Sequence, residues 1–181
     1  TKTGIQINVL LYVDDIVISG NDSATLCTFK SYLSAFFKMK DLGPLKYFLG
    51  IEVARSSAGL FLCQRKYTLD IVSEAGLLGA KPSGFPIEQN HKLGLASGDL
   101  LKDPESYRRL VGRLIYLAVT RPDLAYFVHI LSQFMQEPRT EHWEAALRVV
   151  RYLKGTPGQG ILLSANCDLT LQGWCDSDWA A

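Results

Sequence analysis

Two apolar, β-branched runs near the start of the chain, Ile7 to Val13 and Ile16 to Ser19, are separated by the adjacent carboxylates Asp14 and Asp15. Runs of this composition favour β-strands, and Asp is a residue that tight turns tolerate. The stretch therefore predicts a β-hairpin with two acids at its tip. Acids held in water at the end of a rigid strand pair suit a hard cation such as Mg²⁺. Phosphoryl transfer with two metal ions needs carboxylates of this kind.

The Asp pair has a simpler interpretation as well, in which it only shapes the turn. The overall charge does not decide between the two, because a net charge of +1 gives no basic excess that would indicate nucleic acid. Between Arg108 and Lys154, however, eight Lys and Arg stand against four Asp and Glu, a local excess of four positive charges. This excess indicates either contact with nucleic acid or a solvated helical face.

The composition predicts an intracellular, soluble protein. With 181 residues, 48% of them hydrophobic, the chain is long enough to bury a core and to form one domain or two small ones. The four cysteines lie far apart without a CxxC pattern, which favours small apolar residues in a reducing compartment over a zinc site. No signal peptide and no run of membrane-spanning length is present. The scattered histidines, His91, His129 and His142, are expected to be structural rather than ligands.

The first 80 residues predict an α+β arrangement, with helices against one face of an antiparallel sheet. After the first hairpin, the pattern predicts a helix capped by Asn21, Asp22 or Ser23, a hairpin of strands Leu45 to Val53 and Leu60 to Gln64, and a helix over about 66–75.

The pattern fails from Gly79 to Lys102, where prolines, glycines and polar residues predict a linker or an extended crossing strand, and a domain boundary. Three helices are expected beyond it, followed by two strand-like runs. The first helix is expected to begin at Pro104 with Asp103 as its N-cap, the second at the capping-box spacing of Thr120 to Asp123, and the third at about Thr140. The strands are expected at 160–163 and 169–175.

Several motifs, in order along the whole chain, resemble the reverse transcriptase to ribonuclease H portion of copia-type (Pseudoviridae) retrotransposon polyproteins. The chain is similar to copia-derived open reading frames of plant mitochondria too. The motifs are Leu11-Tyr-Val-Asp-Asp-Ile16, Met39-Lys-Asp-Leu-Gly-Pro-Leu-Lys-Tyr-Phe-Leu-Gly-Ile-Glu52, Gly59-Leu-Phe-Leu-Cys-Gln64, Tyr107-Arg-Arg-Leu-Val-Gly-Arg-Leu-Ile-Tyr-Leu117, Thr120-Arg-Pro-Asp-Leu124, Leu147-Arg-Val-Val-Arg-Tyr-Leu-Lys-Gly-Thr156 and Cys175-Asp-Ser-Asp-Trp-Ala180.

The resemblance implies three regions: a partial polymerase palm in residues 1–80, a linker with thumb and connection helices in 81–158, and the start of a ribonuclease H-like domain in 159–181. It implies an RNA-directed DNA polymerase that uses Mg²⁺ or Mn²⁺, with an RNA/DNA template-primer and deoxynucleotides as partners and no membrane. The expected location is a cytoplasmic virus-like particle or the nucleus, or the mitochondrion for an organellar open reading frame.

The resemblance also assigns roles to individual residues. Asp14 and Asp15 correspond to catalytic, metal-binding carboxylates, and Asp176 corresponds to a metal-binding aspartate of ribonuclease H. The residues expected to contact nucleic acid are Tyr12 and Val13 in the hairpin, Phe48, Leu49 and Gly50 in a primer-grip-like hairpin, and Arg108, Arg109 and Arg113 on the first helix after the linker.

The sequence departs from the family pattern as well. The fingers, the first half of the palm with the third catalytic aspartate, and most of ribonuclease H are not matched. We therefore expect the chain to be a fragment that is inactive alone, with an exposed palm edge that allows self-association. The alternatives are a non-catalytic nucleic-acid-binding remnant and a decayed retroelement open reading frame.

Overall fold

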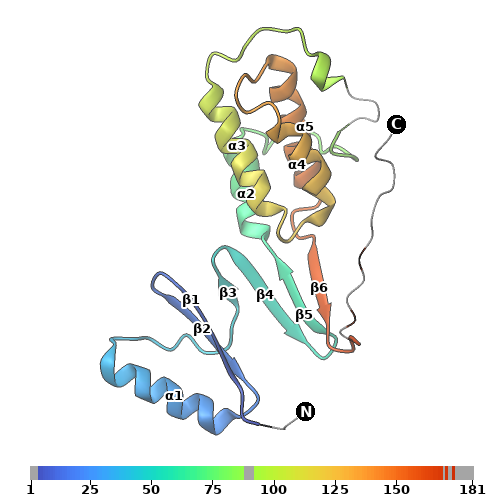
Figure 1. Cartoon of the computed structure of the whole chain (residues 1–181). Coiled ribbons are helices and arrows are strands. Elements are labelled where there is room, and N and C mark those ends of the chain that lie inside the picture. The colour runs from blue at the N-terminus through green and yellow to red at the C-terminus, as the bar shows by residue number, and fades with distance from the viewer. Residues whose placement is uncertain (1–3, 88–91, 169, 171–172, 174–181) are drawn as a thin grey trace. The chain divides into compact units, whose positions relative to one another are not determined.

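The computed structural model describes residues 4–87, 92–168, 170 and 173, and the chain divides into two compact units. The N-terminal unit comprises residues 1–48 and the C-terminal unit residues 49–181. Both combine helices with strands, and the strand pairs with a described register are antiparallel (Figure 1), so the α+β class predicted from the sequence is confirmed.

The N-terminal unit begins with the predicted hairpin, formed by β1 (Ile7–Tyr12) and β2 (Asp15–Gly20). Its register runs from the pair Ile7 and Gly20 to the pair Tyr12 and Asp15. Helix α1 (Ser23–Phe36) follows, and the Asp22 carboxylate caps it by accepting a hydrogen bond from the Thr25 backbone N–H at 2.7 Å. This cap is one of the three that the sequence allowed.

The N-terminal unit has no buried core. Helix α1 packs on β2, but none of its residues is buried, and no described residue between 4 and 48 is buried. Phe36 and Phe37, at the end of α1, are 68% and 62% exposed. The short strand β3 (Tyr47–Phe48) ends this unit. Apolar residues are thus present in number, but their surfaces are left open to solvent.

The C-terminal unit contains an antiparallel sheet in the order β4 (Ile51–Ser56), β5 (Gly59–Cys63) and β6 (Gly160–Ser164). Strand β6 pairs with β5 although the two strands lie far apart in the sequence, with Gly59 opposite Ser164 and Cys63 opposite Gly160. A Cβ atom at Gly160 would collide with the carbonyl group of Leu62, so this close crossing requires glycine. The sequence placed residues 160–163 at the start of a separate ribonuclease H-like domain, whereas here they complete the sheet.

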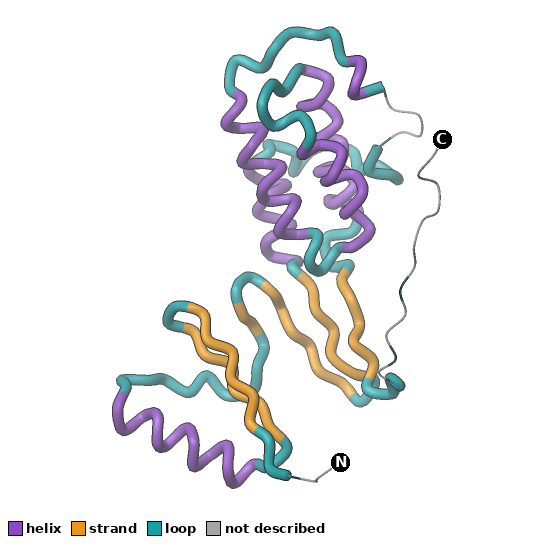
Figure 2. The backbone as a smooth tube through the Cα atoms, in the orientation of Figure 1, coloured by secondary structure: helices purple, strands orange, loops and turns teal. Residues whose placement is uncertain are grey.

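The helices of the C-terminal unit pack on one another and enclose its core (Figure 2). The apolar faces of these helices point toward one another. None of these described helices lies over either face of the sheet β4–β5–β6 (Figure 1), whereas the sequence predicted helices against one face of a sheet. The four helices are α2 (Arg65–Glu74), α3 (Pro104–Leu117), α4 (Ala125–Ser132) and α5 (Thr140–Gly155), and two short 3-10 helices, η1 (Leu93–Leu95) and η2 (Pro122–Leu124), accompany them.

The predicted capping box at Thr120 to Asp123 does not form. The chain instead makes the 3-10 helix η2 with Arg121 as its N-cap, and α4 begins only at Ala125. The Thr120 hydroxyl is buried and donates to the Gln64 side-chain oxygen at 2.9 Å. A tertiary partner therefore replaces the local one that the spacing suggested.

The segment predicted as a linker is fastened to the helices over its described part. The Ser83 backbone N–H donates to the Arg151 carbonyl at 3.1 Å, and the Gly98 N–H donates to the Glu141 carboxylate at 2.7 Å. Leu93 is buried in the same core as the helices. These contacts explain why the two compact units divide at residue 48 rather than after residue 80. In the described part of the chain, no helix has the length and apolar character needed to cross a bilayer.

Candidate functional site

The tip of the β1–β2 hairpin is a two-residue loop, Val13 and Asp14, closed by the pair Tyr12 and Asp15. Val13 has a φ of 49°, which is rare for a β-branched residue, whereas Asp14 has no positive φ. A positive φ at the first loop residue alone matches a type II′ turn, which normally has glycine there. The tip therefore carries backbone strain directly beside the two carboxylates, and strain of this kind gathers at functional sites.

Asp14 lies in the loop and Asp15 begins β2, so the sequence prediction that both acids occupy the turn is only half right. Both residues are exposed, and no ion pair joins either carboxylate to another described residue. Their oxygens are thus available to a ligand. Over the described ranges, no group of three or more His, Cys, Asp or Glu could hold a metal ion. Two carboxylates fit a hard cation that keeps most of its waters or takes further ligands from a phosphate.

The predicted strand Leu45 to Val53 is interrupted by a turn. Leu49 and Gly50, with φ of 50° and 84°, separate β3 from β4, and a pair of positive φ values is typical of a type I′ turn. Gly50 accounts for the interruption, because glycine adopts this conformation without steric cost. The Leu49 carbonyl accepts a hydrogen bond from the hydroxyl of Tyr116 on α3. The role predicted for Phe48, Leu49 and Gly50 at the primer end stays a prediction.

Two of the three arginines expected to contact nucleic acid make internal contacts. Arg108 donates from Nε to the Met135 carbonyl at 2.8 Å and pairs with Glu105 at 2.5 Å. Arg113 pairs with Glu74 on α2, its guanidinium lies 4.9 Å from the centre of the Tyr67 ring, and its side chain is 19% exposed.

Arg109 differs from these two neighbours. Its guanidinium donates to the hydroxyl of Ser106 at 3.3 Å, its charge helps to lower the pKa of Asp103, and it forms no ion pair with another residue in the described part of the chain. Arg108 and Arg113 thus hold α3 to the rest of the C-terminal unit, while Arg109 remains available for an outside partner.

A buried ion pair that sequence reasoning missed lies on η2. Arg121 is 1% exposed and donates to Asp123 from Nε at 2.9 Å and from Nη2 at 2.8 Å. It also donates to the Thr156 carbonyl at 2.9 Å, and the Tyr152 hydroxyl donates to Asp123 at 3.0 Å. In the sequence, Arg121 and Thr156 each lie in a motif that resembles the family. Nothing in the spacing of either motif indicates that the two residues contact each other.

The electrostatics of the pair follow from this geometry. Burial by itself would raise the pKa of the Asp123 carboxyl. The hydrogen bond and positive charge of Arg121, with the hydroxyl of Tyr152, outweigh burial and hold that pKa below its usual value. Asp123 is therefore a charged structural residue. Arg121, one of the eight positive residues between Arg108 and Lys154, is buried in this ion pair rather than exposed on the surface.

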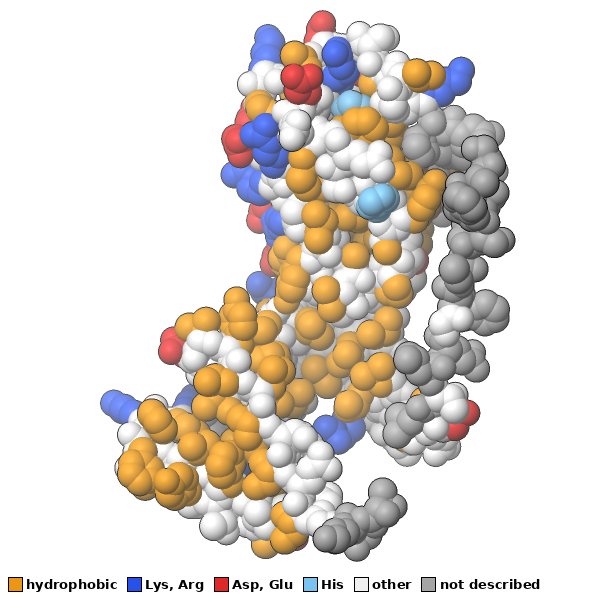
Figure 3. Space-filling model, in the orientation of Figure 1, with side chains coloured by type: hydrophobic (Ala, Val, Ile, Leu, Met, Phe, Trp, Pro, Cys, Tyr) orange, Lys and Arg blue, Asp and Glu red, His pale blue; other side chains and the backbone are white. Residues whose placement is uncertain are grey.

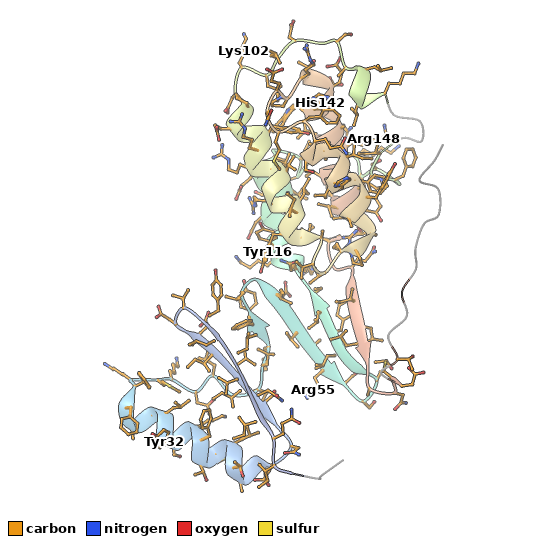
Figure 4. The ribbon with its side chains drawn as sticks, in the orientation of Figure 1. Tyr32, Arg55, Lys102, Tyr116, His142 and Arg148 are labelled. Atoms are coloured by element: carbon orange, nitrogen blue, oxygen red, sulfur yellow. The ribbon has the colours of Figure 1, made fainter. Side chains whose placement is uncertain are left out.

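The histidine prediction is confirmed for His142, which is labelled in Figure 4. Its ring is buried and stacked on that of Phe134, with ring centres 3.9 Å apart. Its Nδ1 accepts from the Arg139 backbone N–H at 2.9 Å, and its Nε2 lies 3.0 Å from the Leu93 carbonyl. Since Nδ1 accepts, Nε2 carries the proton and donates to this carbonyl. His91 and Asp176 fall outside the residues that the structure describes.

Residues 2–89 match the family described as reverse transcriptase (RNA-dependent DNA polymerase). The chain is 49% identical over 174 residues to the retrovirus-related Pol polyprotein from transposon RE2 of Arabidopsis thaliana, an alignment that covers 96% of the chain and 12% of that polyprotein. It is 38% identical to the Pol polyprotein from transposon TNT 1-94 of Nicotiana tabacum, covering 95% of the chain and 14% of that protein. No solved structure matches significantly.

A further relative has a length closer to that of this chain. The uncharacterized mitochondrial protein AtMg00810 of Arabidopsis thaliana is 43% identical over 174 residues, which cover 95% of the chain and 71% of that protein. The chain spans about an eighth of the RE2 polyprotein and most of the mitochondrial protein. The chain therefore belongs to the reverse transcriptase family of copia-type retrotransposon Pol polyproteins and the mitochondrial proteins related to them.

Proposed function

We propose that the β1–β2 hairpin is the metal-binding carboxylate element of an RNA-directed DNA polymerase, with Asp14 and Asp15 as ligands of Mg²⁺ or Mn²⁺. The observation that carries the proposal is the tip itself, where two exposed carboxylates lie at a strained two-residue turn within the region that matches the reverse transcriptase family. Asp14, in the loop, would be the principal direct ligand.

The residues of this chain would act mainly by position in that reaction, in which the 3′ hydroxyl of a primer attacks the α-phosphate of a deoxynucleotide. Bound divalent ions would offset the charge on the attacking and leaving oxygens. The pairing of Tyr12 with Asp15 fixes where the carboxylates lie relative to the strands. A two-residue turn between fully paired strands holds such groups more firmly than a long loop would.

For the template-primer we propose phosphate contacts through Arg109. Among the three arginines of α3 it is the one whose guanidinium makes no ion pair with a described residue. Phosphate contacts position nucleic acid without reading its sequence, and they weaken strongly with salt. The same surface would serve a non-catalytic nucleic-acid-binding protein, so this contact alone does not establish polymerase activity.

Binding of Mn²⁺ to the chain tests the metal site without requiring activity. Paramagnetic broadening of backbone amide signals should centre on residues 12–15 and be lost in Asp14→Asn. The matched control is Asp22→Asn, which removes one carboxylate from the same unit but keeps a good helix cap. Broadening that does not centre on the tip, or that persists after Asp14→Asn, would refute the assignment.

A further inference from the structure

We infer that β1 is a docking edge for a second copy of this chain, which adds its own β1 in antiparallel orientation. This inference concerns an interaction surface and is independent of the proposed catalytic role. It starts from the sheet of the N-terminal unit, which has two strands only, in the order β1–β2. In the described part of that unit, no strand pairs with the other edge of β1, so a row of backbone N–H and C=O groups is left open there.

The side chains of β1 also favour pairing with another strand. Val9, Leu10, Leu11 and Tyr12 are 49%, 56%, 63% and 57% exposed, so apolar surface is open on both faces of the strand. Hydrophobic side chains cover much of the visible face of this unit (Figure 3). A six-residue strand with high β-propensity and no proline or glycine is a strong template for pairing with another strand.

The charge pattern indicates that the partner is a copy of the same strand. Residues 4–13 contain no Lys, Arg, Asp or Glu, whereas exposed edges of natural sheets usually carry such charges to prevent pairing. When a strand pairs with its own copy about a two-fold axis, each residue meets a residue of the same strand, so a charge near the middle of the strand would come close to its own copy. Pairing of β1 with its own copy therefore brings no like charges together along the strand.

The acids at the tip decide the orientation. Parallel pairing would bring Asp14 and Asp15 of both copies to the same end and crowd four carboxylates together. Antiparallel pairing puts the two tips at opposite ends of strands about 20 Å long, which is beyond the range of about 8 Å over which salt leaves charges unscreened. The expected assembly is a four-stranded sheet in the order β2–β1–β1–β2, with both tips accessible.

Sedimentation of the full chain over a range of concentrations tests this inference. The wild-type protein should show a monomer–dimer equilibrium, and Val9→Lys should raise the dissociation constant of the dimer at least about tenfold, because residue 9 lies near the middle of β1, where antiparallel pairing about a two-fold axis brings the two copies of a residue close together. Leu162→Lys is the matched control, since Leu162 is 56% exposed on β6, a strand of the other unit. This control should leave the equilibrium unchanged.

A second lysine variant, Leu10→Lys, and hydrogen exchange keep the test decisive if one variant misfolds. The amides of residues 7–12 should become more protected as the wild-type concentration rises, while unchanged protection of α3 shows that the fold is intact. Three results would overturn the inference: a monomer at all concentrations, a dimer that survives both β1 variants, or a dimer that Leu162→Lys abolishes. A complex with another strand-donating protein in place of the dimer would overturn it as well.

Discussion

Arg121 and Asp123 form a bidentate ion pair inside the C-terminal unit, with 2.9 Å and 2.8 Å between their paired nitrogen and oxygen atoms. The arginine side chain is 1% exposed and the aspartate side chain 28% exposed. Arg121 also donates to Thr156, which follows α5, so the pair ties η2 to the end of that helix. Two motifs that carry the family resemblance in the sequence thus meet in a structural contact.

Replacing Asp123 should therefore destabilise the C-terminal unit. In Asp123→Ala the Arg121 guanidinium stays buried without its counterion, and we expect a loss of about 3 kcal/mol in the free energy of unfolding. Urea denaturation followed by circular dichroism measures this loss. Glu144→Ala, an exposed change on α5, should lie within about 0.5 kcal/mol of wild type. Equal stability of the two variants would show that the pair is not needed.

The same pair predicts how stability depends on pH. The pKa of Asp123 is lower in the folded protein than its value of about 3.9 in an unfolded chain. A depressed pKa gives stability that is fully present above about pH 4 and is lost as the pH falls through the folded value. The stability difference between wild type and Asp123→Asn should therefore be constant near neutral pH and shrink in acid. Other carboxyls, such as those of Asp103 and Glu141, titrate in both proteins and cancel. A constant difference down to about pH 2 would contradict this prediction.

Local chemistry explains which parts of the fold the sequence predicted. The Asp103 cap before Pro104 and the last helix beginning at Thr140 depend on neighbouring residues, and both were correct. The pairing of β6 with β5 was not predicted, because strands that lie far apart in the sequence leave no local signal of their contact. The described part of segment 79–102 shows no periodic pattern of apolar residues. Hydrogen bonds of its backbone N–H groups, such as those of Ser83 to the Arg151 carbonyl and of Gly98 to the Glu141 carboxylate, hold it to the helices in place of an amphipathic face.

The candidate site shows the same division. The identity of Asp14 and Asp15 follows from the hairpin pattern, which is local. The positive φ of Val13 was not predicted, because valine disfavours that conformation and only the two-residue loop imposes it. Similarly, nothing in the spacing of Arg108, Arg109 and Arg113 shows that two of them are engaged by groups on other elements.

Relief of the strain at Val13 should stabilise the hairpin. Val13→Gly keeps the positive φ but removes the steric cost of about 1–2 kcal/mol that this conformation imposes on a non-glycine residue, and the greater flexibility of glycine in the unfolded chain offsets part of that gain. Amides of β1 and β2 should consequently exchange severalfold more slowly. Val17→Gly, within β2, should have the opposite effect, since glycine weakens a strand interior. Faster exchange in Val13→Gly would show that the turn is not strained.

The arginines of α3 should separate into two classes. Arg109→Gln should reduce the salt dependence of binding to an RNA–DNA hybrid by about one phosphate contact and leave stability unchanged. Arg113→Gln should instead lower the free energy of unfolding, because it breaks the contacts with Glu74 and Tyr67. Fluorescence anisotropy at several salt concentrations and urea denaturation measure the two effects. A salt dependence identical to wild type in Arg109→Gln would mean that this side chain is only solvated.

Template-dependent DNA synthesis tests the central claim most directly, namely that the hairpin tip is catalytic. A suitable protein is a chimera in which this chain replaces the matching 174 residues of the RE2 polyprotein. We predict that the chimera incorporates labelled deoxynucleotide on a primed RNA template, and that Asp14→Asn lowers the rate at least about 100-fold through lost metal-ion stabilisation of the transition state. Asp22→Asn should have no effect. An Asp14→Asn chimera as active as its parent would contradict the catalytic assignment.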